Sequence, residues 1–157
     1  MLSETTPINI RFHEVDSLRI VWHGHYLKYF EDGREAFGKK YGIGYMDVFR
    51  AGLATPLIKI SCEYKKAVKY NDKVMLQTTF IPTQAAKIIF EFALFNEDTK
   101  EVYASGESTQ VFLNQNNELM LTSPDFYTEW KKKWDYFPES KNQKIFFIIL
   151  PPNFFSC

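Results

Sequence analysis

The stretch INIRFHEVDSLRIVWHGHYLKYFEDGREAFGKKY, residues 8–41, decides the fold because the spacing of its apolar side chains changes along its length. Residues 7–14 alternate apolar and polar side chains, which predicts a strand with one buried face. Residues 15–22 break the alternation and predict a loop. From His23 the apolar spacing becomes helical, and Gly42 is typical of a helix end. The predicted apolar face of the strand consists of Ile8, Ile10 and Phe12, and that of the helix of Tyr26, Leu27, Phe30, Phe37 and Tyr41.

The chain beyond this helix is predicted to be mainly sheet. Four further segments alternate as strands do, and polar turns separate them. Gly106 interrupts the last of these strands and predicts a bulge or bend. The order of one strand, one long helix and four strands in hairpin-like succession indicates an α+β fold with an antiparallel sheet. The four strands are expected at residues 58–65, 74–80, 88–94 and 101–114, and a short final helix at 125–134.

Length and composition indicate one globular domain. The chain has 157 residues, 45% of them hydrophobic and 24% charged, which is ordinary for a folded domain. The 19 basic and 19 acidic residues balance, so no excess of positive charge points to nucleic acid. Cys62 and Cys157 lack the spacing of a cysteine-based zinc site and fit a reducing compartment. With no signal peptide and no apolar stretch of membrane-spanning length, we expect a cytoplasmic protein.

The C-terminal residues differ from the rest. We expect residues 1–137 to form the single domain and residues 138–157 to be an apolar tail. Exposed β-prone segments of this kind aggregate. Three interpretations stay open for this tail: an added edge strand, packing on a partner subunit, and a non-native extension.

Asp16 is the first candidate for chemistry because it stands in the predicted bend just before the helix. A carboxylate near the positive end of a helix is favoured in its charged form, and it can attack an acyl carbon or activate a water molecule. The alternative is that Asp16 only caps a turn.

His23 and His25 flank Gly24 at the predicted helix start. The first amides of a helix lack intrahelical partners, so they can form an oxyanion site that a glycine leaves open to a ligand. A polar helix terminus without further role is one alternative. A metal site with His13 and Asp16 is another, but this spacing is not a standard ligand pattern, and we expect no metal.

Charged residues elsewhere allow two interpretations each. Glu31 and Arg34 are spaced for an intrahelical ion pair, although Glu31 could also orient water or a substrate group. Lys65, Lys66 and Lys69 could be solvated surface or could receive the phosphates of a nucleotide carrier.

These residues together resemble a known family. The run from Arg11 to Arg34 resembles the signature of the hotdog-fold acyl-CoA thioesterases, most closely the 4-hydroxybenzoyl-CoA thioesterase-like family with its Tol-Pal-associated branch. A second block, from Tyr64 to Asp72, resembles the family motif at the join of two strands, and the resemblance covers residues 5–134. The positions that match the first signature are Arg11, Asp16, Val21, His23, Tyr26, Leu27, Phe30, Glu31 and Arg34.

The resemblance implies a hotdog fold, in which a curved antiparallel sheet wraps around one long central helix, here residues 23–41. Members pair their sheets edge to edge into homodimers, often assembled into homotetramers, with active sites at the dimer interface. It implies that Asp16 acts as nucleophile or general base on an acyl-CoA thioester, while the amide of His23 polarises the carbonyl. No metal or redox cofactor is needed, since coenzyme A belongs to the substrate. The expected substrate-binding residues are Arg19, Trp22, His25, Tyr26, Glu31, Tyr64, Lys65 and Lys66.

The chain departs from the family pattern at four positions. Val15 stands where Thr is usual, Arg19 and Asn71 where Gly is usual, and Ala67 where Pro is usual. Arg19 could bind an anionic group of the substrate or obstruct the site. The changes at Val15 and Arg19 motivate one alternative to an acyl-CoA thioesterase, a protein that holds an acyl-CoA or acyl carrier without hydrolysis. A thioesterase that acts on an acyl carrier protein is a further alternative.

Overall fold

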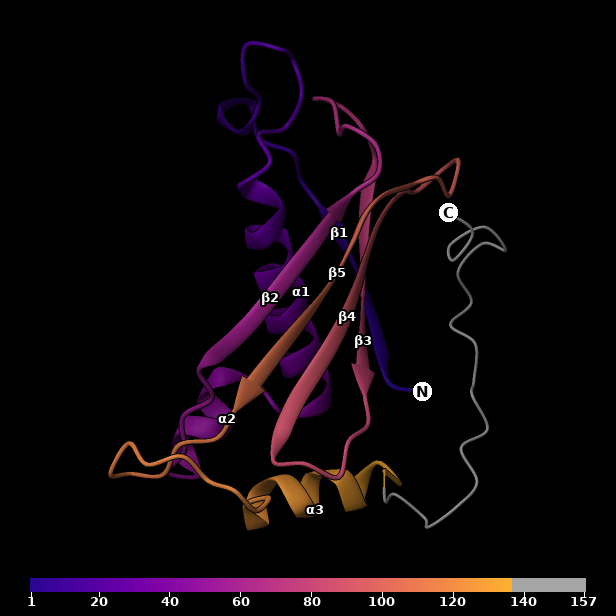
Figure 1. The fold of residues 1–157 in the computed structure, drawn as a ribbon. Coiled ribbons are helices and arrows are strands. Elements are labelled where there is room, and N and C mark those ends of the chain that lie inside the picture. Colours follow the sequence, from indigo (N-terminus) through magenta and orange to yellow (C-terminus); the bar gives the residue numbers. More distant parts are fainter. Residues whose placement is uncertain (137–157) are drawn as a thin grey trace.

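A five-stranded antiparallel sheet curves around one long helix in the computed structural model, which describes residues 1–136 (Figure 1). The α+β prediction is therefore confirmed, whereas the prediction for residues 138–157 lies outside the described residues. The strands are β1 (Ser3–Ile8), β2 (Leu57–Tyr64), β3 (Val74–Ile81), β4 (Lys87–Asn96) and β5 (Val102–Val111). The helices are the 3₁₀ helix η1 (Phe12–Glu14) and the α-helices α1 (His25–Tyr41), α2 (Tyr45–Arg50) and α3 (Asp125–Lys133).

The strand order corrects the predicted succession of hairpins. The order across the sheet is β1-β3-β4-β5-β2, so β3, β4 and β5 form a meander but β2 pairs with β5 instead of β3. The connection over residues 65–73 must therefore cross the ends of β5 and β4. It is fastened to the loop before α1, where the Val21 N–H donates to the Val68 carbonyl oxygen at 2.8 Å and Ile20 bridges to Lys69.

The first strand differs from its prediction. The chain pairs with β3 only from Ser3 to Ile8 and then turns into η1, which leaves Phe12 79% exposed. The turn forms because the Glu14 carboxylate accepts a hydrogen bond from the Arg11 N–H at 2.8 Å. Pro7 obscured the real strand in the sequence, and it is tolerated because β1 lies at the edge of the sheet.

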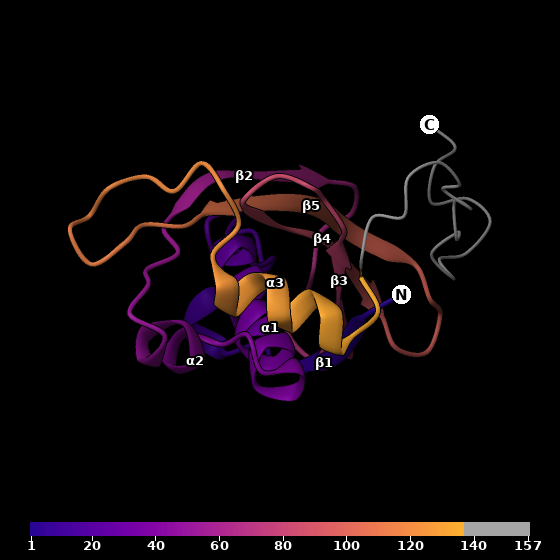
Figure 2. The ribbon, with the colours of Figure 1, turned by 90° about the horizontal axis from the view of Figure 1, so that it is seen from below.

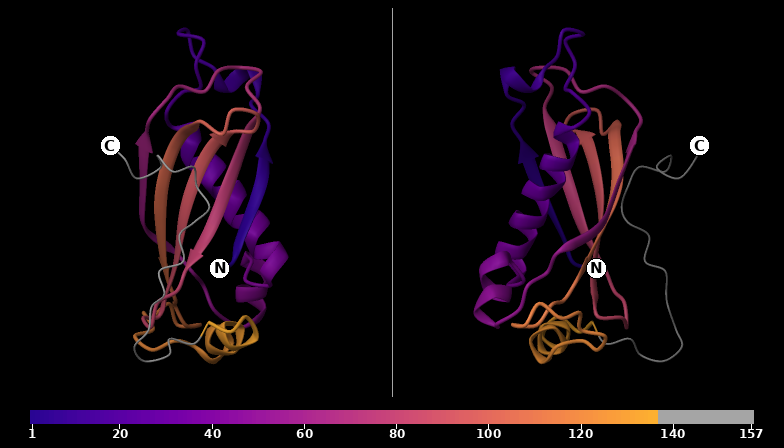
Figure 3. Two further views of the ribbon diagram at one scale, coloured as in Figure 1. Left: turned by 90° about the vertical axis from the view of Figure 1, so that its right-hand side faces the viewer. Right: turned by 60° about the vertical axis from the view of Figure 1, so that its left-hand side comes forward.

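Helix α1 packs its apolar side against the concave face of the sheet (Figures 1 and 3). Phe30 is fully buried and stacks on Phe92 with 4.5 Å between ring centroids. A Cβ on Gly106 would lie 2.3 Å from the Ser61 carbonyl oxygen and 2.4 Å from the Phe30 ring. Gly106 is thus a point of close approach within regular pairing, and the predicted bulge there is wrong. Leu27 also differs from the prediction, since it is 37% exposed.

Helix α3 crosses the end of the molecule where α1 finishes (Figure 2). Its Tyr127 and Trp130 are buried, and the Trp130 indole N–H donates to the Tyr41 carbonyl oxygen at 2.8 Å. Gly42 ends α1 as predicted, with a φ of 75°. This end of the molecule is therefore closed by packing.

A pair of carboxylates on the outer face of the sheet predicts a pH-dependent stability. Glu91 lies directly opposite Glu107, and burial first, then the charge of Glu107, raise the pKa of Glu91. Such a group stabilises the fold below its unfolded pKa, and that contribution is lost as pH rises through the folded pKa. We expect Glu91→Gln to raise the melting temperature at about pH 7 but hardly at about pH 4, measured by thermal unfolding followed by circular dichroism.

Glu97→Gln supplies the control for this measurement, because Glu97 is an exposed acidic residue that follows β4. It should change the melting temperature little at either pH. A gain in Glu91→Gln that is the same at both pH values would contradict the role assigned to charge.

Candidate active site

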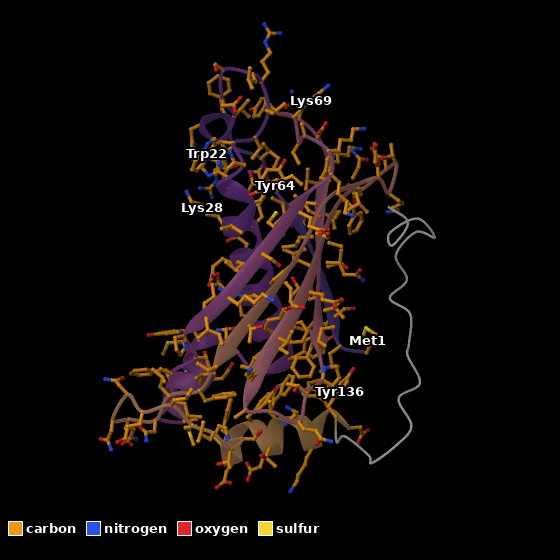
Figure 4. The ribbon with its side chains drawn as sticks, viewed as in Figure 1. Met1, Trp22, Lys28, Tyr64, Lys69 and Tyr136 are labelled. Atoms are coloured by element: carbon orange, nitrogen blue, oxygen red, sulfur yellow. The ribbon has the colours of Figure 1, made fainter. Side chains whose placement is uncertain are left out.

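The candidate residues gather at the N-terminal end of α1, where the loop over residues 15–24 meets the connection over residues 65–73 (Figure 3). Figure 4 places Trp22 and Tyr64 near the start of α1, with Lys69 further toward the end of the molecule. Two segments far apart in sequence thus form this end of the structure together.

Asp16 stands in a tight turn that its own side chain holds. One carboxylate oxygen, Oδ1, accepts the Leu18 N–H at 2.8 Å, and the Asp16 N–H donates to the Ile20 carbonyl oxygen at 2.9 Å. The side chain is half-buried, and within residues 1–136 its other oxygen, Oδ2, accepts no hydrogen bond. The arrangement fixes the carboxylate while leaving one oxygen available for chemistry.

Arg19 occupies the strained position of this turn. Its φ is 64°, a left-handed conformation that costs roughly 1–2 kcal/mol for a residue other than glycine. This conformation explains why a glycine suits the position. The Arg19 side chain is exposed.

The backbone at the start of α1 offers free donors. Within the described residues, the N–H groups of His23 and Gly24 donate to no protein acceptor, whereas the His25 N–H donates to the Trp22 carbonyl oxygen. The Tyr64 hydroxyl donates to the His23 carbonyl oxygen at 2.8 Å and so fixes this peptide from the side of β2. The two free amides can stabilise a negative oxygen, which is the chemistry predicted for His23.

Aromatic side chains surround these amides. A Cβ on Gly24 would lie 1.9 Å from the Trp22 ring, so any larger residue would force this indole to move. Trp22 is 48% exposed and packs edge-on against His25 with 5.5 Å between ring centroids. The Nδ1 atom of His25 is buried without a hydrogen-bond partner. Trp22 and His25 therefore lie beside the free amides, one exposed to solvent and one with an unused polar atom.

Tyr26 and Tyr64 connect the helix start to the sheet. Tyr26 is buried, its hydroxyl accepts the Val68 N–H at 3.2 Å, and its ring contacts Tyr64 edge-on at 4.9 Å. Burial raises the pKa of Tyr26 and raises that of Tyr64 to about 12. Both hydroxyls are therefore neutral hydrogen-bonding groups at physiological pH.

A buried contact that the sequence does not reveal supports the loop. Glu14 is only 8% exposed, and its Oε2 accepts hydrogen bonds from the Arg11 N–H and from the Tyr29 hydroxyl at 2.9 Å. Burial first, then the hydrogen bond to Glu14, raise the pKa of Tyr29 well above its usual value. Glu14 and Tyr29 are fifteen positions apart and neither is among the positions that match the family signature, so no sequence pattern marks this contact.

The remaining predicted residues, Glu31, Lys65 and Lys66, take part in ion pairs. The Glu31 side chain is 66% exposed and forms the predicted ion pair with Arg34. Lys65 pairs with Glu63 at 3.9 Å, and Lys66 pairs with Glu101. These two lysines therefore pair with carboxylates near the ends of strands.

Residues 1–136 contain neither a metal-binding cluster nor a membrane-spanning helix. No three His, Cys, Asp or Glu side chains there lie together as they would around a metal ion. No helix in the same range is both long and apolar enough to cross a membrane. What the site does assemble is a fixed carboxylate and two free amides at a helix start.

Comparisons with known proteins find both similar sequences and similar structures. A sequence profile of the Thioesterase-like superfamily matches residues 10–134. Bacillus subtilis (strain 168) YneP, named as a candidate acyl-CoA thioesterase, is 26% identical over 129 residues, covering 80% of this chain and 93% of YneP. A chloroplastic acyl-acyl carrier protein thioesterase of Arabidopsis thaliana is 24% identical over 107 residues, covering 68% of this chain and 56% of the plant protein.

The solved structure of a DHNA-CoA thioesterase from Staphylococcus aureus superposes with a TM-score of 0.75 at 24% sequence identity. The match covers 86% of this chain and 92% of that one. The predicted hotdog fold, a curved sheet around one central helix, is thereby confirmed.

Proposed function

The chain belongs to the Thioesterase-like superfamily, and from this premise we propose that it hydrolyses acyl-CoA thioesters to a free acid and coenzyme A. The run from Arg11 to Arg34 supports placing it in the 4-hydroxybenzoyl-CoA thioesterase-like family and its Tol-Pal-associated branch. Such an enzyme would act in the cytoplasm, where acyl-CoA is made and used.

One observation carries the proposal: a fixed carboxylate with a free oxygen, Asp16, shares a loop with the free amides of His23 and Gly24. The carboxylate attacks the thioester carbon, or it takes a proton from a water molecule that attacks. Either route puts negative charge on the former carbonyl oxygen, and the helix-start amides donate to it. One such donor is worth roughly 2.7–4 kcal/mol in a hydrolase.

The later steps of the reaction release coenzyme A and the free acid. Collapse of the tetrahedral intermediate breaks the carbon–sulfur bond and releases coenzyme A as a thiol after it gains a proton. If Asp16 attacks directly, an acyl-aspartyl anhydride forms and water then hydrolyses it to the free acid. Tyr64 acts as a positioning residue, because its hydroxyl holds the His23 carbonyl and thereby the orientation of the adjoining peptides.

The proposal is tested by a panel of acyl-CoA thioesters of different chain length and of aromatic type, with release of the free thiol as the signal. Acyl chains bound to an acyl carrier protein form a second arm. Turnover of at least one acyl-CoA is expected. Preference for the carrier-bound chains would favour the carrier-protein thioesterase. Intact acyl-CoA that copurifies, without hydrolysis of any panel member, would favour a binding protein.

We propose further that the active form is a homodimer or homotetramer joined through β2. This strand is the last in the sheet order, and three of its large apolar residues are exposed: Leu57 by 40%, Ile58 by 57% and Tyr64 by 50%. An unpaired strand edge with apolar side chains is a template for pairing with another strand. Antiparallel pairing of two copies of β2 would cover the unpaired edge and the exposed apolar side chains.

Ile58→Asp is expected to weaken this association. A carboxylate buried in the contact between two β2 strands would lose hydration without a partner, so the dissociation constant should rise by at least about tenfold. Sedimentation velocity over a dilution series measures this. Leu121→Asp is the matched control, since Leu121 is 85% exposed and lies outside the sheet. A wild-type protein that is monomeric throughout the series would contradict the proposal.

A further inference from the structure

We propose that the protruding end of the molecule near Asp16 is a docking surface for anionic lipid membranes. The surface, called the tip below, consists of Phe12, Leu18, Arg19, Lys69 and Tyr70. The ribbon shows the loop before α1 extending past the ends of the strands (Figures 1 and 3). This inference concerns where the protein works and does not depend on hydrolysis.

The tip exposes large apolar side chains that nothing in the described residues covers. Phe12 is 79% exposed, Leu18 73% and Tyr70 44%. Phe12 and Tyr70 contact each other edge-on, with 5.8 Å between ring centroids, and so join the two loops of the tip. Aromatic and aliphatic side chains on a projecting loop can enter the boundary between lipid headgroups and acyl chains.

The two charged members of the tip, Arg19 and Lys69, are both basic, and the carboxylates of the same segments accept hydrogen bonds from within the protein. Glu14 is buried against Tyr29, Asp16 accepts the Leu18 N–H, and Asp72 accepts the Lys69 N–H. Arg19 and Lys69 are both exposed, and neither forms an ion pair within residues 1–136. Basic residues beside exposed apolar ones match the negative surface of an anionic membrane.

Acidic residues do occur near this end, in the turn between β4 and β5. Lysines pair with two of them: Lys73 with Asp98 at 3.3 Å, and Lys66 with Glu101. The loop of Leu18 and Arg19 belongs to a different segment, fastened to residues 68 and 69. The acidic turn therefore leaves the positive charge of the tip in place.

A lipid surface fits the tip better than the other anionic ligands do. Small molecules bind in concave sites, whereas these side chains project outward. A stable protein partner needs roughly 800 Å² of surface on each side, far more than five side chains on two loops. A membrane accepts a projecting loop of any outline, and it also holds long-chain acyl compounds.

Vesicle sedimentation with the full-length protein tests the proposal. We expect binding to vesicles of phosphatidylcholine mixed with phosphatidylglycerol, and little to phosphatidylcholine alone. Arg19→Gly should weaken binding about fivefold, the worth of one basic residue at such a surface. Because Arg19 has a φ of 64°, glycine also relieves strain there, so this loss cannot come from unfolding. Leu18→Ser should weaken binding by at least about tenfold through lost apolar burial.

Matched controls lie at the opposite end of the molecule. Arg50→Gln and Leu121→Ser remove an exposed cation and an exposed leucine there, and both should bind like the wild type. The apolar residues 145–157 are present in every variant, so contact through them would give equal binding throughout. Equal binding of tip and control variants would overturn the proposal. So would binding to an acidic acyl carrier protein with no binding to the vesicles.

Discussion

Asp16→Asn is expected to lower the turnover of acyl-CoA thioesters by roughly 100- to 10,000-fold, which is the usual contribution of a general base. An amide can neither attack the thioester carbon nor take a proton from water. The fold should be unaffected, because the asparagine oxygen can still accept the Leu18 N–H that Asp16 accepts at 2.8 Å. Steady-state kinetics on the best substrate of the panel, together with a thermal melt, measures both effects.

Asp47→Asn is the matched control for this change. Asp47 also accepts a backbone N–H with one carboxylate oxygen, that of Gly44 at 2.9 Å, but it lies on α2. Asp47→Asn should therefore leave turnover unchanged. Near-normal turnover in Asp16→Asn would mean that another group carries the chemistry.

Phe30→Ala is expected to destabilise the protein by about 3–5 kcal/mol, the usual cost of removing a buried phenylalanine. The Phe30 ring is fully buried, stacks on Phe92 and fills the space that Gly106 leaves open. Single domains are stable by only about 5–15 kcal/mol, so this is a large share. Urea unfolding followed by tryptophan fluorescence measures the change.

Leu27→Ala on the same helix provides the comparison. Because Leu27 is 37% exposed, this change should lower the free energy of unfolding much less than Phe30→Ala does. Gly106→Ala approaches the same contact from the sheet and should destabilise by about 1–3 kcal/mol through overpacking. A small cost for Phe30→Ala would show that the core can close around the missing ring.

The fold class could be predicted from the sequence because local spacing encodes it. The helical spacing from Tyr26 to Tyr41 and the alternation in the later strands each reflect burial on one side, and the structure confirms both. The pairing of β2 with β5 could not be predicted in the same way. It depends on how the connection over residues 65–73 is fastened to Val21, a contact between distant segments.

The site shows the same division. Asp16 and His23 could be proposed from the sequence because their spacing resembles a known signature. The buried Glu14 and its bond to Tyr29 could not, since a carboxylate that supports a loop looks in sequence like any surface acid. The sequence shows Arg19 only as a departure from the glycine that is usual in the family. Its φ of 64° explains why glycine is favoured at this position.

The hydrogen bond from Tyr64 to the His23 carbonyl joins the edge strand to the proposed oxyanion donors. If β2 is where copies of the chain meet, this one bond makes catalysis sensitive to assembly. Separating the copies would make the end of β2 more mobile. Tyr64 would then hold the His23 carbonyl less firmly, and the helix-start amides would be less well oriented toward the substrate. Specific activity would then fall on dilution below the dissociation constant and recover on concentration. The enzyme would thus respond to its own abundance.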